Sequence, residues 1–215
     1  MRSGSRSTTA DMARIATFAA LIAVMGLVPP LPLFGNVTPI TLQTLGVMLA
    51  GAILGGVPGA LSVVVFLLLV AAGMPFLAGG QGGLGAFFTP SAGFLIGWVP
   101  SAAVVGWLAR PHGGRPAWWR VALGTVVGGI LVVYAIGIPV QALVTGIPLA
   151  KTALLSLMFV PGDLAKAVVT VLLVTALARA YPRAFRRSGR GAGRRPADAR
   201  PANDGADRSV VGGRS

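Results

Sequence analysis

Two residues of opposite charge, Asp163 and Lys166, stand three positions apart in a strongly apolar part of the chain. Asp163 is the only acidic residue between Ile15 and Lys166. An ionisable side chain embedded in lipid costs roughly 2.5 to 3.5 kcal/mol even on insertion-based scales, so its presence there indicates a function. A carboxylate accepts hydrogen bonds and an ammonium donates them. The pair therefore predicts a polar anchor for a ligand that carries a carboxylate and hydrogen-bonding groups.

The local sequence is also compatible with purely structural roles for the two residues. Asp163 follows Pro161 and Gly162 and is expected to begin a helix, where a carboxylate can simply cap the positive helix end. A cap does not account for Lys166, because a cation in the first helical turn opposes the same dipole. Helical spacing puts both residues on nearly one face, about 4.5 Å apart along the axis, with Lys166 leaning toward the outer mouth. A self-contained ion pair and snorkelling of Lys166 to the outer headgroups remain as alternatives.

The chain has the composition of a protein that crosses the membrane several times. Of its 215 residues, 54% are hydrophobic and only 11% are charged, and its mean hydropathy is +0.80. A soluble domain carries about 25% charged residues. Cysteine is absent, which excludes disulfides, thiolate metal ligands and a cysteine nucleophile. We therefore expect a multi-pass protein of the cell (cytoplasmic) membrane, and the sequence indicates neither a metal nor a cofactor.

Windows of about 20 apolar residues predict an all-α integral membrane protein with six transmembrane helices. The chain divides into a basic N-terminal segment at 1–11, a six-helix membrane domain at 12–181 and a basic tail at 182–215. We expect the first helix to be retained, because no A-x-A-like signal-peptidase site follows it. Only the stretch 55–58 separates the second and third helices, which predicts a tight hairpin. The helices are expected near residues 12–28, 41–55, 57–73, 90–109, 118–137 and 163–181.

Positive charge is concentrated on alternate connections of this helix pattern. Arginines precede the first helix and occupy the connection between the fourth and fifth, and ten arginines lie from Arg179 to the end. The loops at 29–40 and 74–89 carry no charge, and the segment 138–162 carries a single lysine. The positive-inside rule then places both termini in the cytoplasm, which requires an even number of helices. The tail at 182–215 is expected to be disordered and to attract anionic membrane lipid rather than nucleic acid.

The loop between the third and fourth helices is expected on the outer face and is rich in glycine. Five glycines fall within the seven residues 79–85. Glycine lets the backbone approach a ligand closely and expose its N–H groups. Gln81 with Gly80, Gly82 and Gly83 is therefore a candidate ligand contact. A phosphate site is not indicated, because no Lys-Ser/Thr pair follows, and a re-entrant turn packed between helices is the structural alternative.

Further polar and small residues carry a weaker functional signal. Gln43, Tyr134 and Gln141 are the remaining polar candidates for ligand contact. The first helix contains two small-xxx-small pairs, a spacing that lets another helix approach closely in lipid. Packing within the chain accounts for such spacing as well as a partner does. The alanines of these pairs are Ala16, Ala20, Ala19 and Ala23.

Three stretches resemble the BioY family, the biotin-binding S components of energy-coupling factor (ECF) vitamin transporters. They read PITLQTLGVMLAG at 39–51, GMPFLAGGQGGLG at 73–85 and PGDLAK at 161–166. Three such stretches in this order and spacing, in a chain with six predicted helices, make the resemblance specific. The sequence departs from the usual family pattern at 87–93, and Phe94 stands where a tyrosine is common.

The resemblance implies a biotin-binding subunit that delivers its substrate to an ECF module. It implies biotin held near the outer face by the loop between helices 3 and 4 and by helices 4 to 6. Lys166 would bind a ligand carboxylate or carbonyl, Asp163 would accept from a ligand N–H or orient the lysine, and Gln81 with its flanking glycines would close over the ring. The first-helix alanines would meet the transmembrane coupling subunit. Separate ATPase subunits would supply energy, since this chain lacks a Walker A sequence.

Other functions remain open at the level of sequence. An S component for another vitamin shares every topological argument and differs only in ligand. A stand-alone secondary transporter or facilitator of a small carboxylate-bearing solute would use the charged pair for ion coupling, but one acid and one lysine make a sparse relay and no inverted repeat is visible. An enzyme is not expected, because the chain has one histidine and no glutamate.

Overall fold

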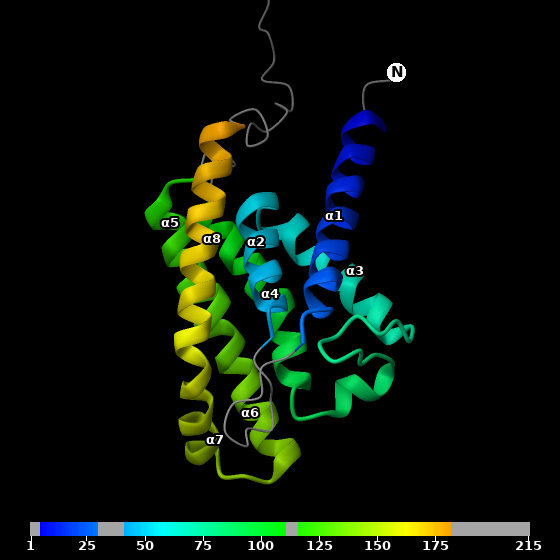
Figure 1. The fold of residues 1–215 in the computed structure, drawn as a ribbon, viewed down its shortest axis with the longest axis vertical. Coiled ribbons are helices and arrows are strands. Elements are labelled where there is room, and N and C mark those ends of the chain that lie inside the picture. The colour runs from blue at the N-terminus through cyan, green and yellow to red at the C-terminus, as the bar shows by residue number, and fades with distance from the viewer. Residues whose placement is uncertain (1–4, 30–40, 111–115, 182–215) are drawn as a thin grey trace, which may run out of the picture.

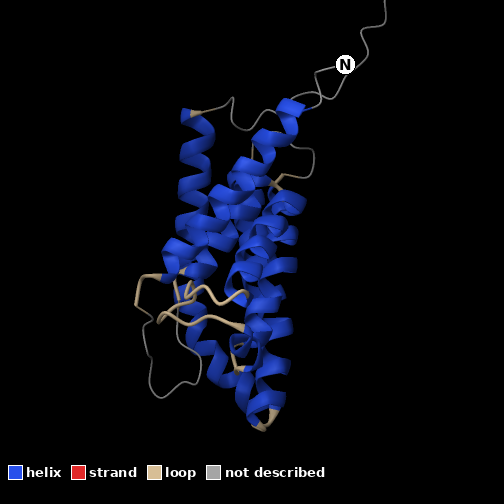
Figure 2. Ribbon diagram, turned by 90° about the vertical axis from the view of Figure 1, so that its right-hand side faces the viewer, coloured by secondary structure: helices blue, strands red, loops and turns tan. Residues whose placement is uncertain are grey.

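The structure, a computed structural model, describes residues 5–29, 41–110 and 116–181. The described chain is a bundle of helices that run roughly along one long axis (Figure 1, Figure 2). The start of α1 and the end of α8 lie at the same end of this bundle (Figure 1). The α-helices are α1 Ser5–Gly26, α2 Gln43–Leu54, α3 Gly56–Ala71, α4 Ala92–Ala109, α5 Trp118–Gly124, α6 Val133–Thr145, α7 Leu149–Ser156 and α8 Val160–Ala180.

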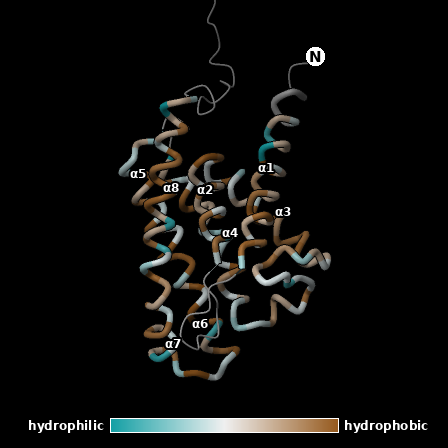
Figure 3. The backbone as a smooth tube through the Cα atoms, viewed as in Figure 1, coloured by the Kyte–Doolittle hydropathy of each residue, from teal (hydrophilic) through white to brown (hydrophobic). Residues whose placement is uncertain are grey.

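Six apolar helical segments build the bundle, as the sequence predicted. Four are long and apolar enough to cross a membrane, namely Thr9–Gly26, α4, the continuous stretch Trp118–Thr145 and the continuous stretch Leu149–Ala180. The shorter apolar helices α2 and α3 complete the six. Figure 3 shows hydrophobic residues over most of the bundle and hydrophilic bands part-way along α8. The prediction of an all-α membrane protein with six helices is confirmed.

Several predicted helix boundaries are wrong. α1 begins at Ser5 rather than near residue 12, and the fifth helical segment continues to Thr145 rather than ending near residue 137. Pro139 lies inside α6 without ending it, because neighbouring helices in a membrane bundle satisfy the backbone groups that a proline frees. The sixth helix begins at Val160 rather than Asp163, and α7 precedes it. The segment 138–162, expected to be a connection, is therefore largely helical.

The second helix is short and starts inside the bundle. α2 has 12 residues, which at about 1.5 Å per residue gives roughly 18 Å, less than the hydrocarbon thickness of about 30 Å. Figure 1 shows its first turn at mid-height in the bundle, with α3 turning back beside it. The predicted break between these helices falls at Gly55, whose φ of 95° a residue with a side chain rarely adopts. The short α2 leaves room below its first turn.

Glycines bring the backbones of α2, α3 and α4 close together. A Cβ atom at Gly51 of α2 would lie 2.5 Å from the carbonyl oxygen of Ala102 in α4. A Cβ at Gly106 of α4 would lie 2.3 Å from the carbonyl carbon of Gly55. No larger residue fits at these positions without moving backbone. These close contacts fix α2, α3 and α4 relative to one another.

The fifth helical segment contains a π-helical stretch, η2 (Thr125–Val132), between α5 and α6. Its two adjacent glycines face two different helices. A Cβ at Gly128 would lie 2.7 Å from the backbone nitrogen of Val105 in α4, and one at Gly129 would lie 2.5 Å from Cε of Met48 in α2. Single π turns inside α-helices are common at functional sites. This stretch sets the position of α6, which begins directly after it.

Some sequence predictions fall outside the described residues. They concern the disorder and lipid attraction of the tail at 182–215, most of the uncharged loop at 29–40, and the basic connection at 111–115. The side of the membrane on which each terminus lies stays a prediction from the charge pattern.

The close approach at Gly106 predicts that even a methyl group destabilises the bundle. We expect Gly106→Ala to cost about 1–3 kcal/mol through overpacking against Gly55. The thermal unfolding midpoint should then fall by at least about 2–4 °C in a protein of this size. Gly97→Ala in the same helix is the matched control, because its Cβ would lie at an ordinary 3.5 Å from Val133. Equal midpoints for the two variants would contradict the packing argument.

Candidate functional site

A cavity of about 360 Å³ lies below the first turn of α2, between α4, α6, α8 and the loop that follows α3. Its volume falls within the range of roughly 300–1,000 Å³ that is typical of small-molecule sites. Polar groups enter from α2, α6 and α8, and apolar rings come mainly from α4. The described residues that line it are Thr41, Gln43, Thr44, Leu77, Ala78, Gly79, Gln81, Thr89, Pro90, Ser91, Phe94, Leu95, Trp98, Gly129, Val133, Tyr134, Phe159, Asp163 and Lys166.

Asp163 and Lys166 form a buried ion pair at this cavity. The Lys166 Nζ atom lies 2.9 Å from Asp163 Oδ1, and Lys166 and Asp163 are 9% and 7% exposed. Both line the cavity, and their contact with a ligand stays a prediction. A buried charge needs a partner and further hydrogen bonds to offset its lost hydration. Each member of the pair supplies the other with that partner.

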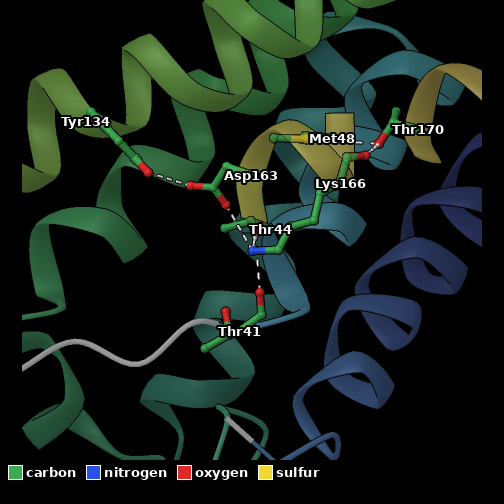
Figure 4. A network of polar contacts seen from close by, with 7 residues as sticks. All are labelled: Thr41, Thr44, Met48, Tyr134, Asp163, Lys166 and Thr170. Atoms are coloured by element: carbon green, nitrogen blue, oxygen red, sulfur yellow. Dashed lines mark hydrogen bonds and ion pairs between the residues drawn. The ribbon is translucent and has the colours of Figure 1, made fainter. Parts of the chain in front are cut away.

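Two residues from other helices complete the network around the pair (Figure 4). Lys166 Nζ donates to Thr44 Oγ1 of α2 at 2.8 Å. The Tyr134 hydroxyl of α6 donates to Asp163 Oδ2 at 2.6 Å. One charged pair on α8 thus binds α2 through the lysine and α6 through the aspartate. The sequence singled out Tyr134 as a weaker candidate and missed Thr44, whose place in the first turn of α2 shows only once α2 and α8 are seen together.

The network leaves hydrogen-bonding capacity for a ligand. An ammonium has three N–H donors, and among the described residues those of Lys166 reach Asp163 and Thr44. A carboxylate offers about four lone pairs, and Asp163 accepts from Lys166 and Tyr134. The cavity therefore presents a donor and an acceptor side by side. A ligand with adjacent acceptor and donor groups can bond both without separating the charges.

A helix-capping role for Asp163 does not hold. Asp163 lies in the first turn of α8, but the helix has no side-chain cap hydrogen bond, and its N-cap position is Phe159. The carboxylate bonds Lys166 and Tyr134 instead. Because α8 begins at Val160, Lys166 falls in the second turn, where the unfavourable effect of the helix dipole on a cation is already weak.

Aromatic side chains form the apolar wall of the cavity. Phe94 meets the Tyr134 ring edge-on, with ring centroids 6.2 Å apart and an interplanar angle of 85°. Trp98, one turn further along α4, is only 4% exposed and packs on Phe66 with centroids 6.2 Å apart. Its indole Nε1–H has no hydrogen-bond partner among the described residues. Trp98 was not singled out at the level of sequence, because a tryptophan in an apolar helix is usually a packing residue.

The glycine-rich loop contributes to the cavity, though through fewer residues than predicted. Gln81 lines the cavity together with Gly79, while Gly80, Gly82 and Gly83 are not among its lining residues. Backbone geometry accounts for these three glycines. Gly80 and Gly83 have φ values of 71° and 82°, and a Cβ at Gly82 would lie 2.2 Å from the carbonyl oxygen of Met74. They shape the turn that carries Gln81.

Gln43 and Gln141, the other polar candidates, differ in whether they line the cavity. Gln43 is 1% exposed and lines the cavity, but its amide bonds backbone groups of other segments. Gln141 is buried in α6, two turns beyond Tyr134, and is not among the residues that line the cavity.

The four alanines of α1 divide between two faces of the helix. Ala19 and Ala23 are 2% and 8% exposed and belong to the main hydrophobic core. Ala16 and Ala20 are exposed, on a stripe rotated by about 60° from that of Ala19 and Ala23. The Ala19/Ala23 pair thus serves packing within the chain, and only the Ala16/Ala20 pair is open to a neighbour in the membrane.

Comparisons with known proteins extend over most of the chain. The model of the BioY family matches residues 1–183. A biotin transporter BioY from Rhizobium etli is 46% identical over 180 residues, which cover 81% of this chain and 96% of that protein. A probable biotin transporter BioY from Bacillus subtilis is 50% identical over 170 residues, which cover 79% and 91%. A crystal structure of the S-component for biotin from an ECF-type ABC transporter matches with a TM-score of 0.78 at 30% identity, covering 85% of this chain and 98% of that one.

The closed ion pair predicts a characteristic pattern of stability without added ligand. Asp163→Asn leaves Lys166 buried without its counter-charge, and breaking a buried pair costs about 3–5 kcal/mol. Replacing both residues, as Asp163→Asn with Lys166→Met, removes the unpaired charge and should recover most of this loss. Thermal unfolding of the parent and the two variants measures the effect. A double variant no more stable than Asp163→Asn would show that charge pairing is not the cause.

Proposed function

The chain belongs to the BioY family, and on that basis we propose that it is the biotin-binding S subunit of an ECF-type ABC transporter. In this role it is a multi-pass protein of the cell membrane that mediates biotin uptake. The observation that carries the ligand assignment is the buried Asp163–Lys166 pair at a cavity of small-molecule size. The relatives named above are transporters, which agrees with a role in binding and transport rather than catalysis.

The chemistry of biotin matches both the polar and the apolar parts of the cavity lining. Its ureido group has two N–H donors beside a carbonyl acceptor, and its fused rings and carbon chain are apolar. We assign Asp163 as the acceptor for a ligand N–H and Lys166 as the donor to a ligand carbonyl or carboxylate. Phe94 and Trp98 supply the apolar wall, and Gln81 at the exposed loop closes over the ring. A mostly apolar lining with a few well-placed polar groups is typical of small-molecule sites.

The partners follow from the same assignment. An S subunit needs ATPase subunits elsewhere, because this chain has no Walker A sequence. We assign the exposed Ala16/Ala20 face of α1 to the transmembrane coupling subunit, since small residues four positions apart allow close helix contact in lipid. The Arg-rich ends of the chain are assigned to the cytoplasmic side and to anionic lipid.

The rival functions make different use of the charged pair. A secondary transporter would need Asp163 or Lys166 to change charge during each cycle. The pair here is closed at 2.9 Å and held by Thr44 and Tyr134, an arrangement suited to a fixed binding geometry. An S component for another vitamin would keep the fold and differ in ligand, and a panel of vitamins titrated against the purified protein separates the two.

Removing either charge should weaken biotin binding strongly. Loss of a hydrogen bond to a charged group costs about 1.5–3 kcal/mol, so we expect the Kd to rise between about ten- and a hundredfold in Lys166→Ala and in Asp163→Asn. Lys151→Ala is the matched control, because the only other lysine of the chain is exposed on α7, outside the cavity. Titration calorimetry on correctly inserted protein measures the Kd. Parent-like affinity in both site variants would refute the assignment.

Biotin binding should also be visible in tryptophan fluorescence. Trp98 is 4% exposed and lines the cavity, whereas Trp107, Trp118 and Trp119 are at least half exposed and lie outside it. Ligand at the cavity should shift or quench the emission of Trp98 alone. The Trp98→Phe protein should then bind biotin, judged by calorimetry, without a change in emission. A biotin-dependent signal that persists in this variant would place the ligand elsewhere.

A further inference from the structure

Gln43, in the first turn of α2, joins three parts of the chain through one side chain. Its Nε2 donates to the carbonyl oxygen of Ile22 in α1 at 3.3 Å and to that of Phe76, in the loop after α3, at 3.0 Å. Its Oε1 accepts the backbone N–H of Ala78 at 3.1 Å. Two carbonyl acceptors on one side and an N–H donor on the other fix the orientation of the amide. The residue is 1% exposed.

These bonds already use the donors of the amide. A side-chain amide nitrogen has two hydrogens, and in Gln43 both are directed at carbonyl oxygens of the chain. A ligand cannot take an N–H bond from Gln43 without breaking one of these contacts. The role of Gln43 at the cavity is therefore to hold other groups in place.

The groups that Gln43 holds belong to the wall of the cavity. Phe76 and Ala78 are the neighbours of Leu77, so the amide fixes the peptide groups on both sides of this residue. Leu77, Ala78 and Gly79 line the cavity, and Leu77 is only 7% exposed. The loop also closes on itself, because the Leu77 N–H donates to the carbonyl oxygen of Gln81 at 3.0 Å.

The end of α1 presses against the same peptide group. Gly26 is the last residue of α1 and is buried. A Cβ atom there would lie 2.1 Å from the Phe76 carbonyl oxygen and 2.9 Å from Gln43 Nε2. The backbones of α1 and of the loop are thus in direct contact beside the side-chain amide of Gln43. A displacement of this end of α1 must displace the loop or break the Gln43 bonds.

We infer that Gln43 is a positioning residue that ties the cavity wall at Leu77 to the end of α1, so that the position of α1 sets how fast biotin leaves the site. The inference rests on the proposed function for its ligand. It requires no contact between Gln43 and biotin. It predicts that disturbing either end of the link, the amide or the α1 glycine, opens the same wall.

Two variants test the link from its two ends. Gln43→Met keeps the side-chain length and removes all three bonds, and Gly26→Ala keeps the amide and pushes on the Phe76 carbonyl. Full-length protein in lipid nanodiscs is loaded with labelled biotin and chased with excess unlabelled biotin. We expect each variant to release biotin at least about tenfold faster than the parent, equivalent to about 1.4 kcal/mol, with a much smaller change in association rate. Dissociation within about twofold of the parent in both variants would overturn the inference.

Matched controls separate this role from general loss of packing. Ser62→Ala removes an equally buried polar group whose hydroxyl, among the described residues, bonds only Gly59 in its own helix. Gly124→Ala crowds the α4–α5 contact instead, where its Cβ would lie 2.9 Å from the carbonyl oxygen of Val105 and its nearest neighbours all belong to α4. Both should release biotin at the parent rate. Equal acceleration in the controls would assign the effect to bundle stability and overturn the inference.

A readout without ligand keeps the inference testable on its own. Hydrogen exchange of the Ala78 backbone amide should be faster in Gly26→Ala than in the parent, although the amide of Gln43 is intact in that variant. Unchanged exchange in Gly26→Ala would overturn the link. A parent protein that fails to bind biotin but shows this exchange pattern would refute the proposed function and leave the positioning role standing.

Discussion

The buried ion pair between Asp163 and Lys166 is the constraint on which the site depends. Two charges inside a bundle of apolar helices are tolerable only if each is paired and further hydrogen-bonded. Here the lysine reaches Thr44 of α2 and the aspartate accepts from Tyr134 of α6. Three helices distant in sequence are thereby held around one small volume. The same groups that stabilise the arrangement are the donor and acceptor that the cavity offers to a ligand.

Room for a ligand next to this pair comes from the way the bundle is packed. α2 has 12 residues, begins at mid-height and leaves the volume below it to side chains of α4, α6 and α8. Glycines at the contacts of α2, α3 and α4 compensate for the short helix, because they bring backbones together on the side away from the cavity. The short α2 thus has two consequences. The helices pack tightly at Gly51 and Gly106, and a volume stays open at Lys166. The loop after α3 then needs a fixed position to close that volume, which the amide of Gln43 supplies.

The sequence predicted the helices and the charged pair because both have strong local signals. Apolar windows indicate six helical segments, and an acid and a base three positions apart in such a window indicate a site. Residues that meet only when two helices pack together have no such local signal in the sequence. Thr44 and Trp98 look like ordinary residues of apolar helices, and only the packing of α2, α4 and α8 brings them to the cavity. The extension of α6 through Pro139 was missed for the same reason, since neighbouring helices decide whether a proline ends a membrane helix.

A closed ion pair also limits which ligands the site can prefer. The pair carries no net charge, and its contacts with Thr44 and Tyr134 help to offset the hydration that both ions lose on burial. A simple anion would have to compete with Asp163 for Lys166, and two anions about 4 Å apart repel by about 4 kcal/mol at an effective dielectric constant near 20. A neutral group with N–H donors beside a carbonyl can instead add bonds to Asp163 and Lys166 while their 2.9 Å contact stays intact. The ureido group of biotin has this arrangement, whereas its carboxylate alone does not. Under the proposed function, selectivity would follow from the pair as a unit, with Thr44 and Tyr134 holding both charges in place.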